Sequence, residues 1–243
     1  MKTYLFGGRL GDLIHGLIIP KYIYDTTGER AHILMSEIGD KFTAGMENTY
    51  NGLIPIMQMQ DFIESFRIFN GETLDYTMFM FRMYPRIEAD CWTDIYFNSF
   101  LPAVRPVKNY SWLIWEKPGE DGSLLVSRKF ILDASTARYL EIIKGWPGPV
   151  NFMAADKEQY EKSGLMDCAT FKHTPELTDM FAAINGCSCF LGDQSAPMAM
   201  ASALGKKRIV ELNRARSHYE YEIQYSDNIT TFHYGYVPDA VTR

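Results

Sequence analysis

The sequence lacks any long apolar run, and so lacks a candidate membrane span. No stretch approaches the ~20 apolar residues that a helix needs to cross a bilayer. The chain starts with one lysine and a short apolar segment that ends in glycines, which is not the pattern of a secretion signal. We therefore expect a cytoplasmic protein with no transmembrane segment.

Cysteine is scarce as well. The four cysteines, Cys91, Cys168, Cys187 and Cys189, have no CxxC spacing, which is the pattern typical of zinc and redox sites. We expect all four to be reduced and packed in helices or strands. Further metal ligands beside Cys187 and Cys189 are not recognisable, so no metal site is predicted.

The sequence also has no excess of positive charge. It contains 24 lysines and arginines and 30 aspartates and glutamates, which gives a net charge of −6. Proteins that bind nucleic acid generally show a basic excess or stripe, so no nucleic-acid partner is expected. The only dense basic cluster, Lys206–Arg208, is interpreted as a solvated segment at a helix end. Local cations can still hold an anionic small molecule, and 47% apolar residues predict a sizeable core.

What the sequence does contain is a repeated alternation of strand and helix patterns. The predicted elements of the first half are a strand at 2–6, a helix from 13 to about 25 that kinks at Pro20, a strand at 31–35, a strand at 76–81 and a helix at 92–100. The first strand, the first helix and the second strand form a βαβ unit with parallel strands. The stretch 39–71 predicts only short elements and loops.

The alternation restarts after Lys117–Gly122, a polar segment with proline and glycine that is the best candidate linker. The predicted elements of the second half are strands at 124–126, 150–153, 188–191 and 208–212, and helices at 134–143, 156–163 and 176–185. We therefore predict an α/β protein with two compact, Rossmann-like βαβ lobes that face a cleft. The lobes span residues 1–118 and 123–225, and a tail, 226–243, packs back.

The first strand leads into a glycine-rich turn at the start of a helix. Gly7, Gly8 and Gly11 let the backbone turn sharply and approach a ligand. Asp12 lies in the first turn of the helix, at the edge of the sheet where open α/β folds bind ligands. Its carboxylate can remove a proton from an acceptor hydroxyl. The alternative is an aspartate that only caps the helix.

A second strand–turn–helix junction lies near the other end of the chain. Pro197 is suited to the first turn of a helix capped by Ser195 or Ala196. Unpaired N–H groups at such a helix start favour an anion, so Gly192, Gln194 and Ser195 are candidates to hold a diphosphate. Asp193 in the same loop either takes part in donor binding or caps the helix.

Four further charged residues are candidates for binding. Arg128 directly follows a strand and can neutralise a leaving phosphate, as a metal would. Glu211 lies near the end of a strand and can accept hydrogen bonds from both ribose hydroxyls, or is an ordinary strand-end carboxylate. Arg82 and Arg86 can contact an anionic acceptor, or are surface residues.

These motifs together resemble the heptosyltransferase-type family of glycosyltransferases, which have the two-lobed GT-B architecture. The N-terminal lobe of that family opens with a Gly-x-Leu-Gly-Asp-hydrophobic turn, matched here by Gly8–Leu13. The resemblance implies that Asp12 is the general base. It also implies that Gly192–Met198 holds the nucleoside diphosphate, as the counterpart of a Gly-x-Asp-Thr-Gly-x-x-His-like loop. Gln194–Ser195 replaces Thr-Gly and Met198 replaces the histidine, so the chain resembles a divergent, short member.

The leading hypothesis is therefore an inverting, metal-independent glycosyltransferase without a cofactor. The N-terminal lobe would hold a glycan, lipid-linked or protein acceptor through Gly8, Gly11, Arg82 and Arg86, and the C-terminal lobe would hold a nucleotide-sugar donor. One alternative is a sugar-nucleotide epimerase or hydrolase on a similar scaffold. Another is a non-catalytic protein that binds a nucleotide sugar or a glycan, which the missing loop histidine favours.

Overall fold

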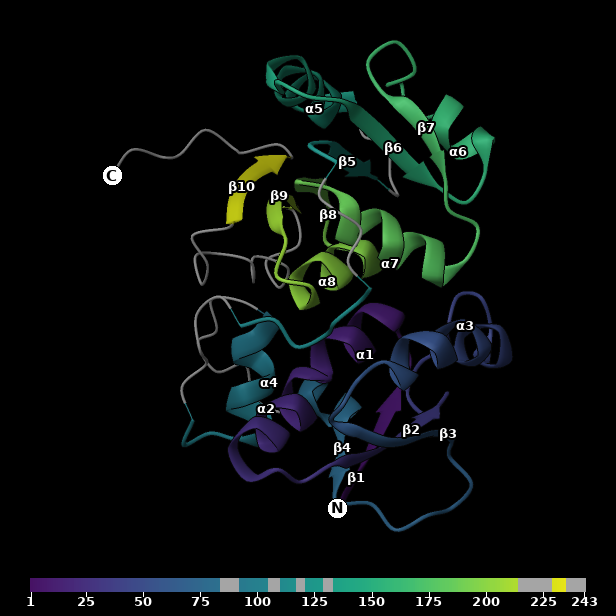
Figure 1. Cartoon of the computed structure of the whole chain (residues 1–243), viewed down its shortest axis with the longest axis vertical. Coiled ribbons are helices and arrows are strands. Elements are labelled where there is room, and N and C mark those ends of the chain that lie inside the picture. The colour runs from purple at the N-terminus through teal and green to yellow at the C-terminus, as the bar shows by residue number, and fades with distance from the viewer. Residues whose placement is uncertain (84–91, 105–109, 117–120, 129–132, 214–228, 235–243) are drawn as a thin grey trace.

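The protein, described here as a computed structural model, contains two parallel sheets in separate lobes (Figure 1). The structure describes residues 1–83, 92–104, 110–116, 121–128, 133–213 and 229–234. Every pairing between described strands is parallel. This agrees with the predicted α/β class and with two βαβ lobes.

The N-terminal sheet has four strands in the order β3-β2-β1-β4. The strands are β1 (Lys2–Gly7), β2 (Ala31–Ser36), β3 (Ile63–Ile68) and β4 (Tyr76–Thr77). The helices of this lobe are α1 (Leu10–Gly16), α2 (Ile18–Thr27), α3 (Met46–Gln58), the 3-10 helix η1 (Met78–Arg82) and α4 (Trp92–Phe100). Buried apolar runs such as Tyr4–Phe6 and Ile33–Met35 are typical of parallel strands that are covered on both faces.

The C-terminal sheet has six strands in the order β10-β9-β8-β5-β6-β7. The strands are β5 (Leu124–Ser127), β6 (Val150–Ala154), β7 (Thr170–His173), β8 (Cys189–Asp193), β9 (Lys207–Asn213) and β10 (Ile229–Tyr234). The helices are α5 (Asp133–Gly145), α6 (Lys157–Glu161), α7 (Leu177–Gly186) and α8 (Ala196–Ala203). In chain order within the lobe this is the strand order 3-2-1-4-5-6 of dinucleotide-binding folds.

In both sheets the order in which strands are added reverses beside the first strand. The reversal lies between β1 and β4 in one sheet and between β5 and β8 in the other. In open α/β sheets ligands bind outside the carboxyl ends of the strands at this switch point. The residues that follow β1, β5 and β8 are Gly8, Arg128 and Gln194. The topology therefore places both predicted glycine loops and Arg128 at the sheet edges where open α/β folds generally bind ligands.

The elements of the first half differ from the prediction in three places. The single helix ending near Asp25 is two helices, α1 and α2, which meet at Leu17. Pro20 lies in the first turn of α2, where its missing N–H leaves no helical bond unmade. The stretch predicted as short elements and loops contains the 13-residue helix α3 and the strand β3. Leu53, Ile56 and Met57 form a buried face of α3 despite Pro55 inside the helix. The strand predicted at 76–81 ends at Thr77.

The second half follows the prediction more closely, with additions at the edges of the sheet. The sequence did not indicate β7 or β10. Because β10 pairs with β9, residues 229–234 of the predicted tail lie against the C-terminal sheet. Lys206 and Arg208 are buried and donate hydrogen bonds to backbone carbonyls, so the predicted solvated cluster is wrong. The domain boundary near 118 falls at residues 117–120, outside the described ranges, and stays a prediction.

Candidate active site

The two glycine loops, far apart in sequence, meet between the lobes. Helix α1 packs against α8 at the centre of the molecule (Figure 1). A Cβ atom added to Gly11 would lie 3.6 Å from the Cα of Ala196, the first residue of α8. One hydrophobic core runs through this contact and includes Leu13 of α1, Phe181 of α7 and Met200 of α8. The start of α1 and the start of α8 therefore form one continuous region.

The connector between the lobes, residues 110–116, bonds to both of these helices. The Trp112 indole N–H donates to the carbonyl oxygen of Ile14 in α1 at 2.7 Å. The backbone N–H groups of Trp112 and Leu113 both donate to the carbonyl of Ala203 at the end of α8, each at 3.0 Å. The connector is thus a strap that fixes α1 and α8 to each other.

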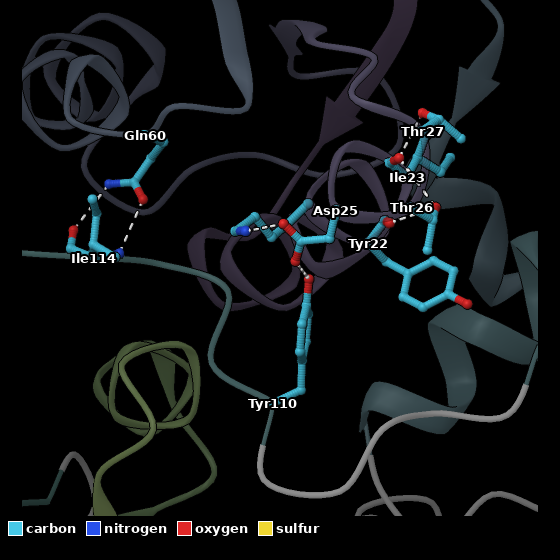
Figure 2. A network of polar contacts seen from close by, with 9 residues as sticks. Tyr22, Ile23, Asp25, Thr26, Thr27, Gln60, Tyr110 and Ile114 are labelled. Carbon is cyan, nitrogen blue, oxygen red and sulfur yellow. Dashed lines mark hydrogen bonds and ion pairs between the residues drawn. The ribbon is translucent and has the colours of Figure 1, made fainter.

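Figure 2 shows how the strap is held on the N-terminal lobe. The Gln60 side chain donates to the carbonyl of Ile114 and accepts from its N–H, both at 3.0 Å. The Tyr110 hydroxyl donates to the Asp25 carboxylate, which also pairs with Lys21. The Asn185 side chain of α7 donates to the strap at Glu116, at 2.8 Å. The strap therefore has fixed contacts on both lobes.

The turn after β1 requires glycine at two positions. Gly8 has φ = +88°, a conformation that other residues adopt at a cost. A Cβ on Gly7 would lie 2.5 Å from the carbonyl oxygen of Ile38 and 2.9 Å from the Phe79 ring. These two glycines therefore let the loops after β1 and β2 come close together, whereas a Cβ on Gly11 would make only an ordinary contact with α8.

Asp12 lies in the first turn of α1 and is mostly buried, with 14% of its side chain exposed. The capping position belongs to Arg9, so the alternative of a capping aspartate is wrong. The Asp12 carboxylate pairs with Arg82, and its backbone carbonyl accepts the Tyr96 hydroxyl at 2.7 Å. Burial raises the pKa of Asp12 above its ordinary value although the Arg82 cation opposes this. A carboxylate with a raised pKa is suited to accept a proton.

Two arginines flank Asp12 at the edge of the N-terminal lobe. The Arg82 side chain is 44% exposed. Arg9, which the sequence analysis did not single out, pairs with Asp40 at 2.7 Å and is also solvent-exposed. This hydrogen bond from Arg9 holds the pKa of Asp40 below its usual value. Arg9 directly follows Gly8 in the glycine motif, and this position was the sequence feature that could have identified it as a neighbour of Asp12. Arg86 lies outside the described residues.

Arg128 and Glu211 come together at the switch point of the C-terminal sheet. Arg128 Nε lies 3.7 Å from Glu211 Oε2, and both side chains are almost fully buried. The Tyr139 hydroxyl, on α5, donates to the same Oε2 atom at 2.8 Å. The Arg128 guanidinium lies over the Tyr139 ring, 4.6 Å from its centroid. Tyr139 was missed because nothing in its local sequence separates it from an ordinary core tyrosine.

The loop after β8 leads into α8 as predicted. Ser195 occupies the capping position and Pro197 lies in the first turn. The Ser195 N–H donates to the backbone carbonyl of Asp193 at 2.8 Å, and the residue at the capping position is Ser195, not Asp193. Asp193 lies beside Glu211 in the register of β8 and β9. A Cβ on Gly192 would lie 2.6 Å from the carbonyl of Ser127, so glycine is needed there for strand packing.

Two other residues of this loop region differ in their surroundings. The amide nitrogen of Gln194 is buried without a hydrogen-bond partner among the described residues. Met198, which stands in the position of the family histidine, points into the core, and its sulfur accepts from the Ser202 hydroxyl at 3.4 Å. Met198 is therefore a core residue, whereas Gly192, Asp193, Gln194 and Ser195 stay candidates for donor binding.

Within the described ranges, no group of three histidine, cysteine, aspartate or glutamate side chains is arranged to hold a metal ion. Among the same residues, each helix is too short or too polar to cross a bilayer. The free cysteines Cys187 and Cys189 are buried in the core, and Cys168 is half-buried. Cys91 lies outside the described residues.

The fold is similar to solved glycosyltransferase structures. No protein-family model and no curated protein matches the sequence. A glycosyltransferase family 9 protein from Veillonella parvula superimposes with a TM-score of 0.61 at 11% identity, over 96% of this chain and 86% of that one. The ADP-heptose lipopolysaccharide heptosyltransferase II of E. coli gives 0.57 at 10% identity, over 96% and 90%.

A third solved structure carries a metal. The dodecameric, iron-containing glycosyltransferase TibC of E. coli gives a TM-score of 0.56 at 12% identity, over 96% of this chain and 62% of that one. At such identities the comparison establishes the fold and not the activity. The chain therefore has the two-lobed, GT-B-like fold of the heptosyltransferase-like glycosyltransferases.

Proposed function

We propose that this chain is a glycosyltransferase that moves a sugar from a nucleoside-diphosphate donor to an acceptor hydroxyl. The observation that supports the proposal is the contact between Gly11 and Ala196: Gly11 directly precedes Asp12 in one lobe, and Ala196 directly follows the candidate diphosphate loop of the other. A transferase needs this juxtaposition of a base with a donor site. The fold it shares with family 9 glycosyltransferases supports the same reaction class.

In the proposed reaction Asp12 acts as the general base on the acceptor side. Its carboxylate takes the proton of the acceptor hydroxyl, the oxygen forms a bond to the anomeric carbon, and the bond from that carbon to the diphosphate oxygen breaks. Attack from the side opposite the leaving group inverts the anomeric centre. The exposed guanidinium of Arg82 can bind an anionic group of the acceptor. The acceptor is a glycan, a lipid-linked sugar or a protein.

The C-terminal lobe would bind the donor. The N-terminal end of α8, with the side-chain amide of Gln194 and the hydroxyl of Ser195, would bind the diphosphate. Arg128 would stabilise the charge on the leaving group, and Glu211 would accept the ribose hydroxyls. A positive side chain in this position makes a metal unnecessary in the proposed mechanism. TibC, which has the same fold, contains iron, so metal dependence needs a direct test.

Binding of nucleoside diphosphates tests the donor half of the proposal. The melting temperature is measured with ADP, GDP, UDP, dTDP and CMP, each with and without magnesium and ferrous iron. A ligand at a hundred times its dissociation constant adds about 2.7 kcal/mol of stability, and each kcal/mol raises the melting temperature by about 2–4 °C at this chain length. We expect one diphosphate to give a shift of several degrees without metal. No shift with any of them contradicts the proposal.

One observation favours a second candidate, a non-catalytic protein that binds a nucleotide sugar. Met198 replaces the histidine of the family motif and its side chain packs in the core. This candidate predicts the same thermal shift but no release of nucleoside diphosphate from any nucleotide sugar, with or without acceptor. Diphosphate release that needs an acceptor excludes it. Release without acceptor indicates a hydrolase, and conversion of the donor sugar without release indicates an epimerase.

A further inference from the structure

We propose that Tyr139 is a positioning residue that orients Glu211 for the ribose of the donor. The inference rests on the proposed function, because it requires a nucleotide at the switch point of the C-terminal sheet. Tyr139 lies in α5, the helix that follows β5 and Arg128 in the chain. It contacts both charged residues assigned to the donor and was not itself a candidate from the sequence.

The contacts of Tyr139 separate into a hydroxyl part and a ring part. The hydroxyl donates to Glu211 Oε2 at 2.8 Å, and the ring lies under the Arg128 guanidinium, 4.6 Å from its centroid. Arg128 Nε lies 3.7 Å from the same Oε2 atom. This carboxylate oxygen therefore accepts a hydrogen bond from Tyr139 and lies within ion-pair distance of Arg128, and both contacts restrict the orientation of Glu211.

Burial makes this arrangement rigid. Only 3% of Glu211 and none of the Tyr139 surface is exposed, so a change of rotamer would break a hydrogen bond inside the protein. Burial and the neighbouring carboxylates raise the pKa of the Tyr139 hydroxyl well above its ordinary value, so it remains a donor at every working pH. A carboxylate that must recognise two ribose hydroxyls needs such a fixed orientation, because misplacement weakens both bonds.

The variant Tyr139→Phe tests the hydroxyl alone, since it keeps the ring beneath Arg128. Dissociation constants are measured by calorimetry for ADP, GDP and UDP, for their 2′-deoxy counterparts and for the corresponding monophosphates. We expect the wild type to prefer the ribonucleotide by about tenfold, the effect of one hydrogen bond to a charged group. Tyr139→Phe should bring this ratio close to one, while the preference for diphosphate over monophosphate is unchanged. Glu211→Gln should change the same ratio.

Tyr160→Phe is the matched control, because its hydroxyl bonds to the Ala169 carbonyl at 2.6 Å and not to Glu211. It should leave the ribose ratio as in the wild type. Equal weakening of ribo- and deoxynucleotides by Tyr139→Phe would mean a merely structural role and overturn the inference, as would a wild type that does not prefer ribose. Failure of the wild type to bind any nucleotide would overturn the proposed function as well, so the two failures are distinguishable.

Discussion

At Asp12, burial and ion pairing act in opposite directions on one carboxyl group. Burial disfavours the charged form and raises the pKa, and the Arg82 guanidinium favours the charged form and lowers it, with burial the larger effect. The general base must be deprotonated to accept the acceptor proton. Activity should therefore rise with pH through the pKa of Asp12, on the acid side of the pH profile.

The variant Arg82→Gln should move this acid limb of kcat/KM to higher pH. Removal of the cation takes away a stabiliser of the Asp12 carboxylate, so the pKa rises further and more alkaline conditions are needed to deprotonate the base. Arg82→Lys keeps the charge and should leave the limb close to its wild-type position. A limb that stays fixed in Arg82→Gln would show that Asp12 is not the titrating base.

His15 predicts a pH dependence of stability that is separate from catalysis. It is buried next to Trp92, with its ring stacked at 5.5 Å, and burial together with Arg208 lowers its pKa from 6.5 to about 3. The unfolded chain binds a proton below about pH 6.5 and the folded chain does not. His15 therefore contributes stability that is complete above pH 6.5 and is lost as the pH falls toward 3.

Urea denaturation of the wild type and of His15→Phe at pH 7.5 and 5.5 measures this contribution. The difference in unfolding free energy between the wild type and the variant should shrink by about 1.4 kcal/mol between the two pH values. This is the effect of one proton bound by the unfolded chain over the single pH unit below its pKa of about 6.5. Comparison with the variant cancels the titration of other groups. Parallel changes in both proteins would show that His15 takes up a proton in the folded state.

At the scale of elements, the sequence indicated those whose apolar pattern was uninterrupted and missed those whose pattern was broken. The helix at α4 and the strands β5, β6 and β8 follow their predictions closely. Helix α3 was missed because Gly52 and Pro55 are unfavourable inside a helix. The helix forms because the burial of its apolar face against the core offsets their cost. Strands β7 and β10 are edges of the sheet, and their pairing depends on neighbours that no local pattern reveals.

The glycines of the first loop should respond differently to alanine. In Gly7→Ala the new Cβ meets the Ile38 carbonyl at 2.5 Å, so the backbone must move and stability should fall by about 1–3 kcal/mol. In Gly11→Ala the Cβ lies 3.6 Å from Ala196, an ordinary contact, and alanine is the better helix former. That variant should be as stable as the wild type or slightly more stable. Thermal unfolding of both variants checks this. A Gly11→Ala variant that is less stable than Gly7→Ala would contradict the geometry.

For the whole molecule, the sequence predicted the two lobes but not how they meet. Asp12 and Ser195 became candidates through local motifs, whereas the packing of α1 on α8 and the strap through Trp112 join segments that are distant in sequence. The same holds for Tyr139, whose proposed role rests on its hydrogen bond to Glu211. Long-range contacts of this kind are decided by tertiary packing, so a single sequence shows the parts of the site and not their assembly.

The most direct test of the central claim measures donor binding and sugar transfer together in Asp12→Asn. Asparagine keeps the shape of the side chain but cannot take a proton, so transfer from the nucleotide sugar should fall by about 10²–10⁴-fold. The dissociation constant of the nucleoside diphosphate should stay within about threefold of the wild type. Loss of even one hydrogen bond to the donor would change this constant by more than that. Transfer that persists, or donor binding that is lost with it, would contradict the assignment of Asp12 as the base of a glycosyltransferase.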